Sequence, residues 1–317
     1  MRSLPALRPP LAGLHHVTAI CGDPQANYDF YTRVLGMRLV KKTVNFDDPG
    51  TYHLYYGDAV GTPGSVLTFF SWRDTPSGRD GTGQISATAL ATSEAGLAYW
   101  QARLKENDVE FRGPMQRFDD VYLEFSDPDG MILEIVVADQ ATAFQPWSRS
   151  PVPEAMQFRG FHSVTLAEAS YERTQALLTH QMGWTLLRES GGRFRYQAPG
   201  AGPASLVDIL CQPGARHGLS GTGTVHHVAF RVPNDAAQLA WSQALAEFGL
   251  SVSPVRDRTY FHSVYYREPG GILFEIATEP PGFALDESPE ALGSALMLPP
   301  QFESLRAQIE KHLPALR

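Results

Sequence analysis

The chain has 317 residues, of which 43% are hydrophobic and 19% are charged, and its formal net charge is −8. This length suits two domains, and the composition is that of a globular protein with enough apolar residues to form cores. The negative charge argues against a nucleic-acid or anionic-membrane partner. Two distant cysteines exclude a disulfide scaffold and are typical of the reducing cytoplasm. No apolar stretch approaches the roughly 20 residues that span a bilayer.

The predicted elements follow one order four times along the chain: a short strand, a helix and then several strands. In the first copy, Asp23 is the predicted N-cap, Pro24 takes the first helical position and Gly36 is the predicted stop. The second helix is predicted to begin after Ser93. Each helix precedes strands rich in Val, Tyr, Phe and Leu. We therefore predict four βαβββ modules, at residues 11–73, 84–138, 159–212 and 224–278.

A proline-containing segment without periodicity separates the second module from the third and is interpreted as a linker. The predicted fold class is therefore α+β, with two tandem domains that each contain a pair of βαβββ modules. The predicted ranges are an N-terminal domain at 1–140, a linker at 141–158, a C-terminal domain at 159–280 and a tail with a short helix at 281–317.

Two histidine doublets begin equivalent strands, in GLHHVTAI near the N-terminus and in TVHHVAFRV of the fourth module. Because side chains alternate along a strand, we expect the two histidines of each doublet to point to opposite faces. His16 and His227 are predicted to face the cup of a curved sheet, while their apolar neighbours pack on the helices. His15 and His226 are then candidates for hydrogen bonding near the site.

The ends of the second and fourth modules are nearly identical, SDPDGMILEIVV and REPGGILFEIAT, and place Glu134 and Glu275 at equivalent positions. The apolar neighbours of Glu275 face the core, so its carboxylate is predicted to enter the cup with His16 and His227. Two imidazoles and one carboxylate form a facial triad that suits a divalent first-row metal with open positions. The sequence therefore predicts a metal site made from both ends of the chain.

The equivalent positions in the other two modules keep only one of these ligands. Ser163 stands in place of His16 and Ala87 in place of His227, while Glu134 remains. Core packing would require histidine in both cups, so the asymmetry favours a metal as the reason for the histidines. We expect Glu134, without partners, to be an ordinary exposed strand residue.

Four βαβββ modules with a His–His–Glu site resemble the vicinal oxygen chelate superfamily, which includes glyoxalases, extradiol dioxygenases and fosfomycin-resistance proteins. The stretches LHHVT, VHHVAF, YFHSVYYREPGGILFE and LPPQFE resemble the ring-cleaving dioxygenases that open hydroquinones. The resemblance covers nearly the whole chain. It implies a non-haem Fe(II)-dependent dioxygenase that acts on hydroquinone-type diols with O2, with His16, His227 and Glu275 as ligands and Mn(II) as the alternative metal. A homo-oligomer is the expected assembly.

The resemblance also implies a set of polar groups around the substrate, namely Tyr265, Arg258, His15, His226 and Thr18. Tyr265 precedes Glu275 across a hairpin, so we expect the two to lie close together, where the phenol can donate a hydrogen bond or a proton. Packing on the sheet is the alternative role of Tyr265. Arg258 is expected to hold either an anionic ring oxygen or a surface carboxylate.

Three other functions use a similar fold. A catechol-type extradiol dioxygenase usually draws its ligands from the second domain, where Ser163 occupies the position of the required histidine. A glyoxalase-like isomerase or lyase would hold Zn, Ni or Co, and a non-catalytic binding protein would not need the triad. His53 and His262 are further candidates for the pocket wall, and the sequence leaves their placement open.

Overall fold

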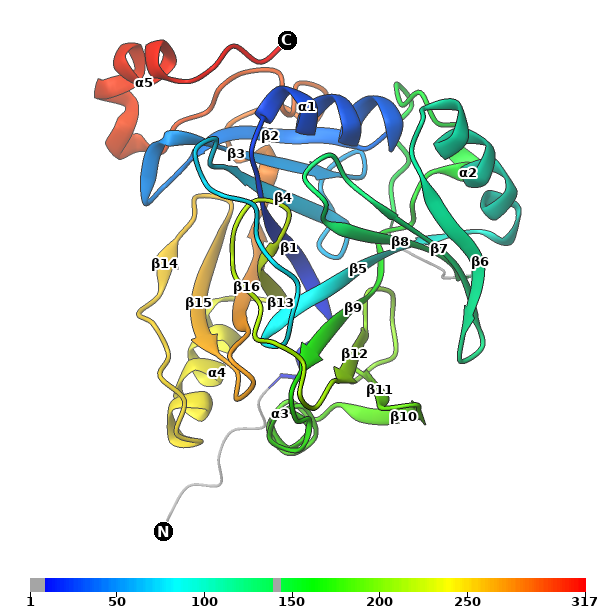
Figure 1. Ribbon diagram of the computed structural model, residues 1–317. Coiled ribbons are helices and arrows are strands. Elements are labelled where there is room, and N and C mark those ends of the chain that lie inside the picture. Colours follow the sequence, from blue (N-terminus) through cyan, green and yellow to red (C-terminus); the bar gives the residue numbers. More distant parts are fainter. Residues whose placement is uncertain (1–8, 139–143) are drawn as a thin grey trace.

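A computed structural model describes residues 9–138 and 144–317 of the chain (Figure 1). In these ranges the chain forms four consecutive βαβββ modules, which confirms the predicted α+β fold class. Within the same ranges, no helix combines the length and the apolar character that crossing a bilayer requires. Of the predicted linker, residues 141–143 lie outside the described residues.

The bounds of the elements follow the predicted modules closely. The first module comprises β1 (Leu14–Cys21), α1 (Pro24–Asp29), the π-helix η1 (Phe30–Val34), β2 (Arg38–Asn45), β3 (Asp48–Gly57) and β4 (Val66–Ser71). The second comprises β5 (Gln84–Thr92), α2 (Glu94–Glu106), β6 (Phe111–Arg117), β7 (Asp120–Ser126) and β8 (Ile132–Val137). The third comprises β9 (Phe161–Glu168), α3 (Glu172–Ala176), the π-helix η3 (Leu177–Gln181), β10 (Thr185–Ser190), β11 (Arg193–Gln197) and β12 (Leu206–Cys211).

The fourth module and the tail complete the chain. The module comprises β13 (Val225–Val232), α4 (Asp235–Glu247), β14 (Arg256–Asp257), β15 (Phe261–Arg267) and β16 (Leu273–Pro281). Outside the modules lie the short 3-10 helices η2 (Glu154–Met156), η4 (Phe283–Leu285) and η5 (Pro300–Leu305) and the helix α5 (Arg306–His312).

The helix ends carry the residues that the sequence indicated. The Asp23 carboxylate accepts a hydrogen bond of 2.9 Å from the backbone N–H of Gln25, and Ser93 caps α2 in the same way. Pro24 begins α1, and Gly36 follows the first helical segment with a φ of 69°, a left-handed conformation that glycine adopts without strain. The predicted caps and stop of these helices are therefore confirmed.

The strands form two eight-stranded sheets, and each sheet combines modules from both halves of the chain. The first sheet has the order β14-β15-β16-β13-β1-β4-β3-β2, and the second has the order β10-β11-β12-β9-β5-β8-β7-β6. Module 1 thus pairs with module 4, and module 2 with module 3. The predicted ranges 1–140 and 159–280 therefore do not each form a sheet of their own, because the β1–β13 and β5–β9 pairs join the two halves.

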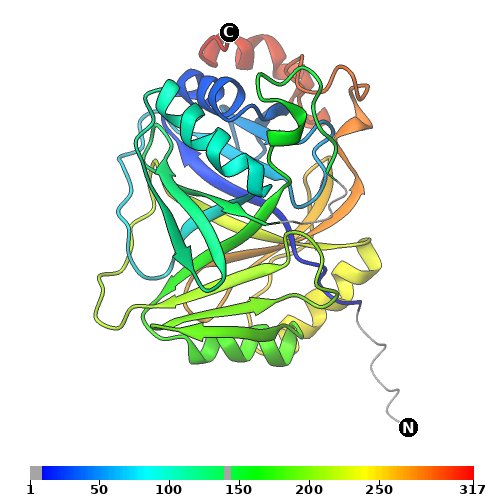
Figure 2. The ribbon, with the colours of Figure 1, turned by 90° about the vertical axis from the view of Figure 1, so that its right-hand side faces the viewer.

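The helices lie outside the two curved sheets. Figures 1 and 2 show α1 and α2 at one end of the molecule and α3 and α4 at the opposite end. Val17, Val228 and Phe274 of the first sheet are fully buried in one hydrophobic core with Tyr31 of η1 and Trp241 of α4. The predicted apolar face of the first sheet therefore packs toward the helices, and its other face is left for polar groups.

A buried lysine fixes the C-terminal tail to the first sheet. The ammonium Nζ of Lys41 on β2 lies 2.6 Å from Oδ1 of Asp286 and 2.5 Å from Oε2 of Glu287. The phenol of Tyr260 also donates a hydrogen bond of 2.9 Å to Asp286. Lys41 is fully buried, so its charge depends on these two carboxylates for compensation. This cluster holds the segment after β16 against the sheet edge.

Two buried carboxylates meet where module 3 contacts module 4. The hydroxyl of Thr174 lies 2.8 Å from Oε2 of Glu168 and 2.6 Å from Oε2 of Glu268. One hydroxyl proton cannot serve both carboxylates, so one carboxyl group must itself carry a proton. Burial, reinforced by the charge of Glu268, raises the pKa of Glu168 to about 8, and burial also raises the pKa of Glu268.

We expect this pair to make the fold less stable in alkaline solution. The pKa of Glu168 is about 8 in the folded protein and about 4.5 in the unfolded chain. The protonated carboxyl group therefore stabilises the fold fully below pH 4.5, and this stabilisation is lost as the pH rises through 8. The free energy of unfolding should fall by about 1 kcal/mol between pH 7 and 9 through this group. Urea denaturation of Glu168→Gln should show a smaller fall in the free energy of unfolding over the same pH range. An equal pH slope in Glu168→Gln and in the exposed-site control Glu106→Gln would contradict this expectation.

Candidate active site

Strand register places the three predicted ligands on one face of the first sheet. His16 of β1 pairs with Ala229 of β13, and Ala229 pairs in turn with Glu275 of β16. His227 pairs with Thr18, two residues further along the same two central strands and therefore on the same face. The ligands therefore come from three adjacent strands, and the small side chain of Ala229 leaves space between two of them.

The ligand atoms lie at the spacing of a metal site. Nε2 of His16 is 3.4 Å from Oε2 of Glu275 and 3.4 Å from Nε2 of His227, and His227 Nε2 is 2.9 Å from the same carboxylate oxygen. Three atoms on one face of an octahedron, each about 2.1 Å from a metal, lie about 3 Å from one another. All three side chains are buried. The donor set and its dimensions therefore fit a divalent first-row metal held by a facial triad.

Each histidine doublet contains a β-bulge. His15 is the extra residue where β1 pairs with β13, and His226 is the extra residue of β13 in the same pairing. A bulge changes the direction of successive side chains, so the two imidazoles of each doublet lie side by side. Nδ1 of His15 is 2.9 Å from Nδ1 of His16, and Nδ1 of His226 is 2.7 Å from Nδ1 of His227. The prediction that the doublet histidines point to opposite faces is therefore wrong.

The bulged histidines are uncharged partners of the ligand histidines. Burial and then His16 lower the pKa of His15 to about 3, and burial and then His227 lower the pKa of His226 to about 3. A neutral neighbour accepts a hydrogen bond from Nδ1–H of the ligand imidazole, which leaves the Nε2 lone pair directed at the metal position. The doublets therefore orient the imidazoles of His16 and His227, and the tautomer that carries its proton on Nδ1 leaves Nε2 available to a metal.

Glu275 is held as a carboxylate although it is fully buried. Burial alone would raise its pKa, but His16 and His227 beside it hold the pKa well below its usual range. The hydroxyl of Ser263 donates a hydrogen bond to the second carboxylate oxygen, Oε1. Sequence reasoning missed Ser263, although its place two residues before Tyr265 on β15 puts both side chains on one face.

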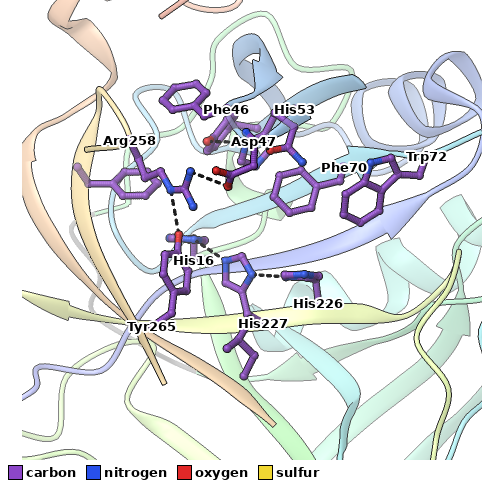
Figure 3. A pocket seen from close by; sticks show the side chains of 14 residues that line it. His16, Phe46, Asp47, His53, Phe70, Trp72, His226, His227, Arg258 and Tyr265 are labelled. Atoms are coloured by element: carbon purple, nitrogen blue, oxygen red, sulfur yellow. Dashed lines mark hydrogen bonds and ion pairs between the residues drawn. The ribbon is translucent and has the colours of Figure 1, made fainter. Parts of the chain in front are cut away.

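A cavity of about 300 Å³ opens beside His16 and His227. Figure 3 shows the side chains that line it. His16, His226 and His227 lie at one side of it. Its walls are mainly aromatic and apolar and include Phe46, Tyr55, Phe70, Trp72, Phe261 and Leu273. A cavity of this size and lining suits a small aromatic ligand next to the metal position.

Tyr265 and Arg258 lie together in the cavity wall (Figure 3). Tyr265 pairs directly with Glu275 across the β15–β16 hairpin, and its ring centroid is 5.7 Å from that of His227. Arg258 donates a hydrogen bond of 3.2 Å from Nε to the Tyr265 hydroxyl. Burial and then Glu275 raise the pKa of Tyr265, so the phenol keeps its proton at neutral pH. The pair thus brings a proton donor and a fixed positive charge next to the ligands.

The remaining candidates lie at different depths. Thr18 is fully buried behind the cavity wall, with its hydroxyl oxygen 2.8 Å from that of Thr68, which is itself 2.9 Å from Nε2 of His53. His53 lines the cavity. His262 instead faces away from the cavity, with Nδ1 2.6 Å from the Asp235 carboxylate of α4. Of the two candidates left open by the sequence, only His53 reaches the cavity.

The corresponding cup of the second sheet contains an ion pair. Glu134 is buried and accepts two hydrogen bonds, of 2.7 and 2.6 Å, from the guanidinium of Arg117 on β6. The expectation that Glu134 is exposed is therefore wrong, because a bidentate arginine compensates its charge inside the cup. Ala87 and Ser163 occupy the positions that carry histidine in the first sheet.

Comparison with known proteins agrees with this architecture. The family model described as "Glyoxalase/Bleomycin resistance protein/Dioxygenase superfamily" matches residues 13–135 and 160–276. The chain is 45% identical to "Putative ring-cleaving dioxygenase MhqO" of Bacillus subtilis (strain 168), over 95% of each chain. It is 36% identical to "Chlorohydroquinone/hydroquinone 1,2-dioxygenase" of Sphingobium indicum, over 94% of each chain.

Solved structures show the same relationship. A crystal structure of a Bacillus subtilis protein, 44% identical, superposes with a TM-score of 0.93 and covers 96% of this chain and 97% of that chain. Glyoxalase I from Zea mays, at 17% identity, shares the fold with a TM-score of 0.61 over 84% of this chain and 92% of that chain. From its modules, its matched regions and its relatives, the chain belongs to the glyoxalase/bleomycin resistance protein/dioxygenase superfamily.

Proposed function

We propose that this protein is a ring-cleaving dioxygenase that holds mononuclear Fe(II) at His16, His227 and Glu275 and opens hydroquinone-type diols with O2. The observation that carries the proposal is the facial arrangement of the ligand atoms beside an aromatic cavity. A site with only three protein ligands leaves positions for both a diol and O2. The names of the relatives, one of which is a hydroquinone 1,2-dioxygenase, support this reaction class.

The reaction uses the metal and the cavity residues for different tasks. When bound, Fe(II) supplies open positions that bring the diol and O2 together and a route for electrons between them. His15 and His226 hold the ligand imidazoles in place. The aromatic walls orient the ring and exclude water from it.

Tyr265 and Arg258 are proposed to act on the substrate directly. The protonated phenol of Tyr265 is placed to donate a hydrogen bond or a proton to oxygen at the cavity end nearest the ligands. The guanidinium of Arg258 stabilises negative charge that develops on the ring oxygen. Thr18, through Thr68, supports His53 in the wall and has a positioning role.

Oxygen uptake by the anaerobically Fe(II)-loaded protein tests this function. We expect uptake of one O2 for each hydroquinone consumed, and slower uptake with catechol. A His262→Ala variant should keep the activity, because this histidine of β15 points away from the cavity. Faster turnover of catechol would instead assign a catechol-type extradiol enzyme. A protein that binds one metal per chain but consumes no O2 with either diol would be assigned to the isomerases or lyases of this fold. The same assay with Mn(II) identifies the metal that supports turnover.

A further inference from the structure

An ion pair joins two loops at the rim of the cavity. Asp47 lies in the turn between β2 and β3, and Arg258 lies in the turn between β14 and β15. Oδ2 of Asp47 is 3.1 Å from Nη1 of Arg258 (Figure 3). Both residues line the cavity, yet the Asp47 side chain is 69% exposed and that of Arg258 only 20%. Asp47 therefore reaches Arg258 from the solvent side.

This pair determines the fixed charge that a ligand meets in the cavity wall. Arg258 is the one lysine or arginine among the described residues that line the cavity, and Asp47 is the one aspartate or glutamate among them. A charged substituent that reaches the rim of the cavity therefore meets Arg258 and Asp47.

Asp47 contributes little to holding Arg258 in place, because Arg258 makes other contacts. Exposed ion pairs contribute only about 0.2–1 kcal/mol, so the Asp47 carboxylate can be displaced or removed at small cost. Arg258 keeps its place by other contacts: its Nε donates to Tyr265, and its backbone N–H donates to the carbonyl of Phe261 at 3.0 Å. Loss of the Asp47 charge would thus leave the guanidinium in the cavity without its counter-ion.

We propose that Asp47 is a specificity-determining residue that makes the cavity favour uncharged aromatic diols over diols that carry a carboxylate. Its carboxylate occupies Arg258 and repels a second anion at the same rim. The inference rests on the proposed function in taking aromatic diols as the ligands. It goes beyond that function because it assigns the discrimination between ligands to one exposed turn residue outside the metal site.

The proposal is tested with Asp47→Asn, which keeps the shape of the side chain and removes its charge. Binding of 4-hydroxybenzoate and of uncharged 4-methylphenol is measured by isothermal titration calorimetry without O2, with and without Fe(II). We expect the Kd of 4-hydroxybenzoate to fall about three- to fivefold at low salt, which is the size of one exposed ion pair. The Kd of 4-methylphenol should stay the same. Asp119→Asn, which removes an exposed ion pair with Arg188 elsewhere, should change neither value.

Each other outcome has a definite meaning. An unchanged Kd for 4-hydroxybenzoate, or an equal change for both ligands, would overturn the proposal. The difference should shrink as the salt concentration rises, because the Asp47 side chain is largely exposed. In the Fe(II)-loaded protein with O2, Asp47→Asn should raise kcat/KM for 2,5-dihydroxybenzoate relative to hydroquinone by a similar factor. If no variant turns over either diol but the binding shift is present, the proposed function fails and the role of Asp47 stands.

Discussion

Replacement of Glu275 by glutamine is expected to lower the affinity for Fe(II) by roughly two to three orders of magnitude. Structural metal sites with four ligands bind with about 10–16 kcal/mol, so one anionic ligand of three accounts for several kcal/mol. The variant keeps the volume of the side chain at a fully buried position, so the loss reports on charge and coordination rather than on packing. Metal content after dialysis and calorimetric titration measure the change, and ring cleavage should be lost with the metal.

The matched control lies on the same strand. Glu279, four residues further along β16, has a side chain that is 44% exposed, and Glu279→Gln should retain the metal and the activity. If Glu275→Gln binds Fe(II) as tightly as Glu279→Gln does, the carboxylate is not a ligand and the facial triad is wrong. The distance of 2.9 Å between Glu275 and His227 would then describe an ordinary buried ion pair.

Replacement of Lys41 by methionine is expected to lower the free energy of unfolding by about 3–5 kcal/mol. The substitution removes the ammonium group of Lys41. The carboxylates of Asp286 and of the nearly buried Glu287 then lack the cation that compensates their charge. Breaking a buried pair costs more than forming it gains, because the remaining charge has lost both water and its partner. Urea denaturation followed by circular dichroism measures the difference.

A neighbouring lysine and a second substitution make this expectation specific. Lys42→Met, at the next and less buried position, should change the stability by less than about 1 kcal/mol. Adding Glu287→Gln to Lys41→Met should recover part of the loss, because it removes one uncompensated charge. Equal stability of Lys41→Met and Lys42→Met would show that the cluster with Asp286 and Glu287 does not hold the tail.

The modules could be predicted because their signals are local. Caps such as Asp23 and Ser93 and turn sequences such as SDPDG act within a few residues, and the structure places them where the sequence indicated. The alignment of one module with another identifies His16, His227 and Glu275 as a group without reference to strand pairing. Their meeting in the structure follows from strand register across the centre of the sheet.

Features that depend on strands distant in sequence could not be predicted from local sequence signals. The bulges at His15 and His226 exist only in the pairing of β1 with β13, which lie about two hundred residues apart in sequence. The burial of Glu134 depends on Arg117, and the role proposed for Asp47 depends on Arg258, in each case a residue from another strand or turn. Alternation along one strand cannot reveal such partners.

The pairing of the first module with the fourth also determines when the proposed metal site can form during synthesis of the chain. β1, which carries His16, is synthesised well before its neighbour β13 and before β16, the strand of Glu275. A growing chain therefore has β4 on one side of β1 and an unpaired edge on the other until the fourth module appears. A chain cut short before Glu275 lacks one of the three proposed ligands, so the proposed metal site is complete only after the fourth module has been made and has paired with the first.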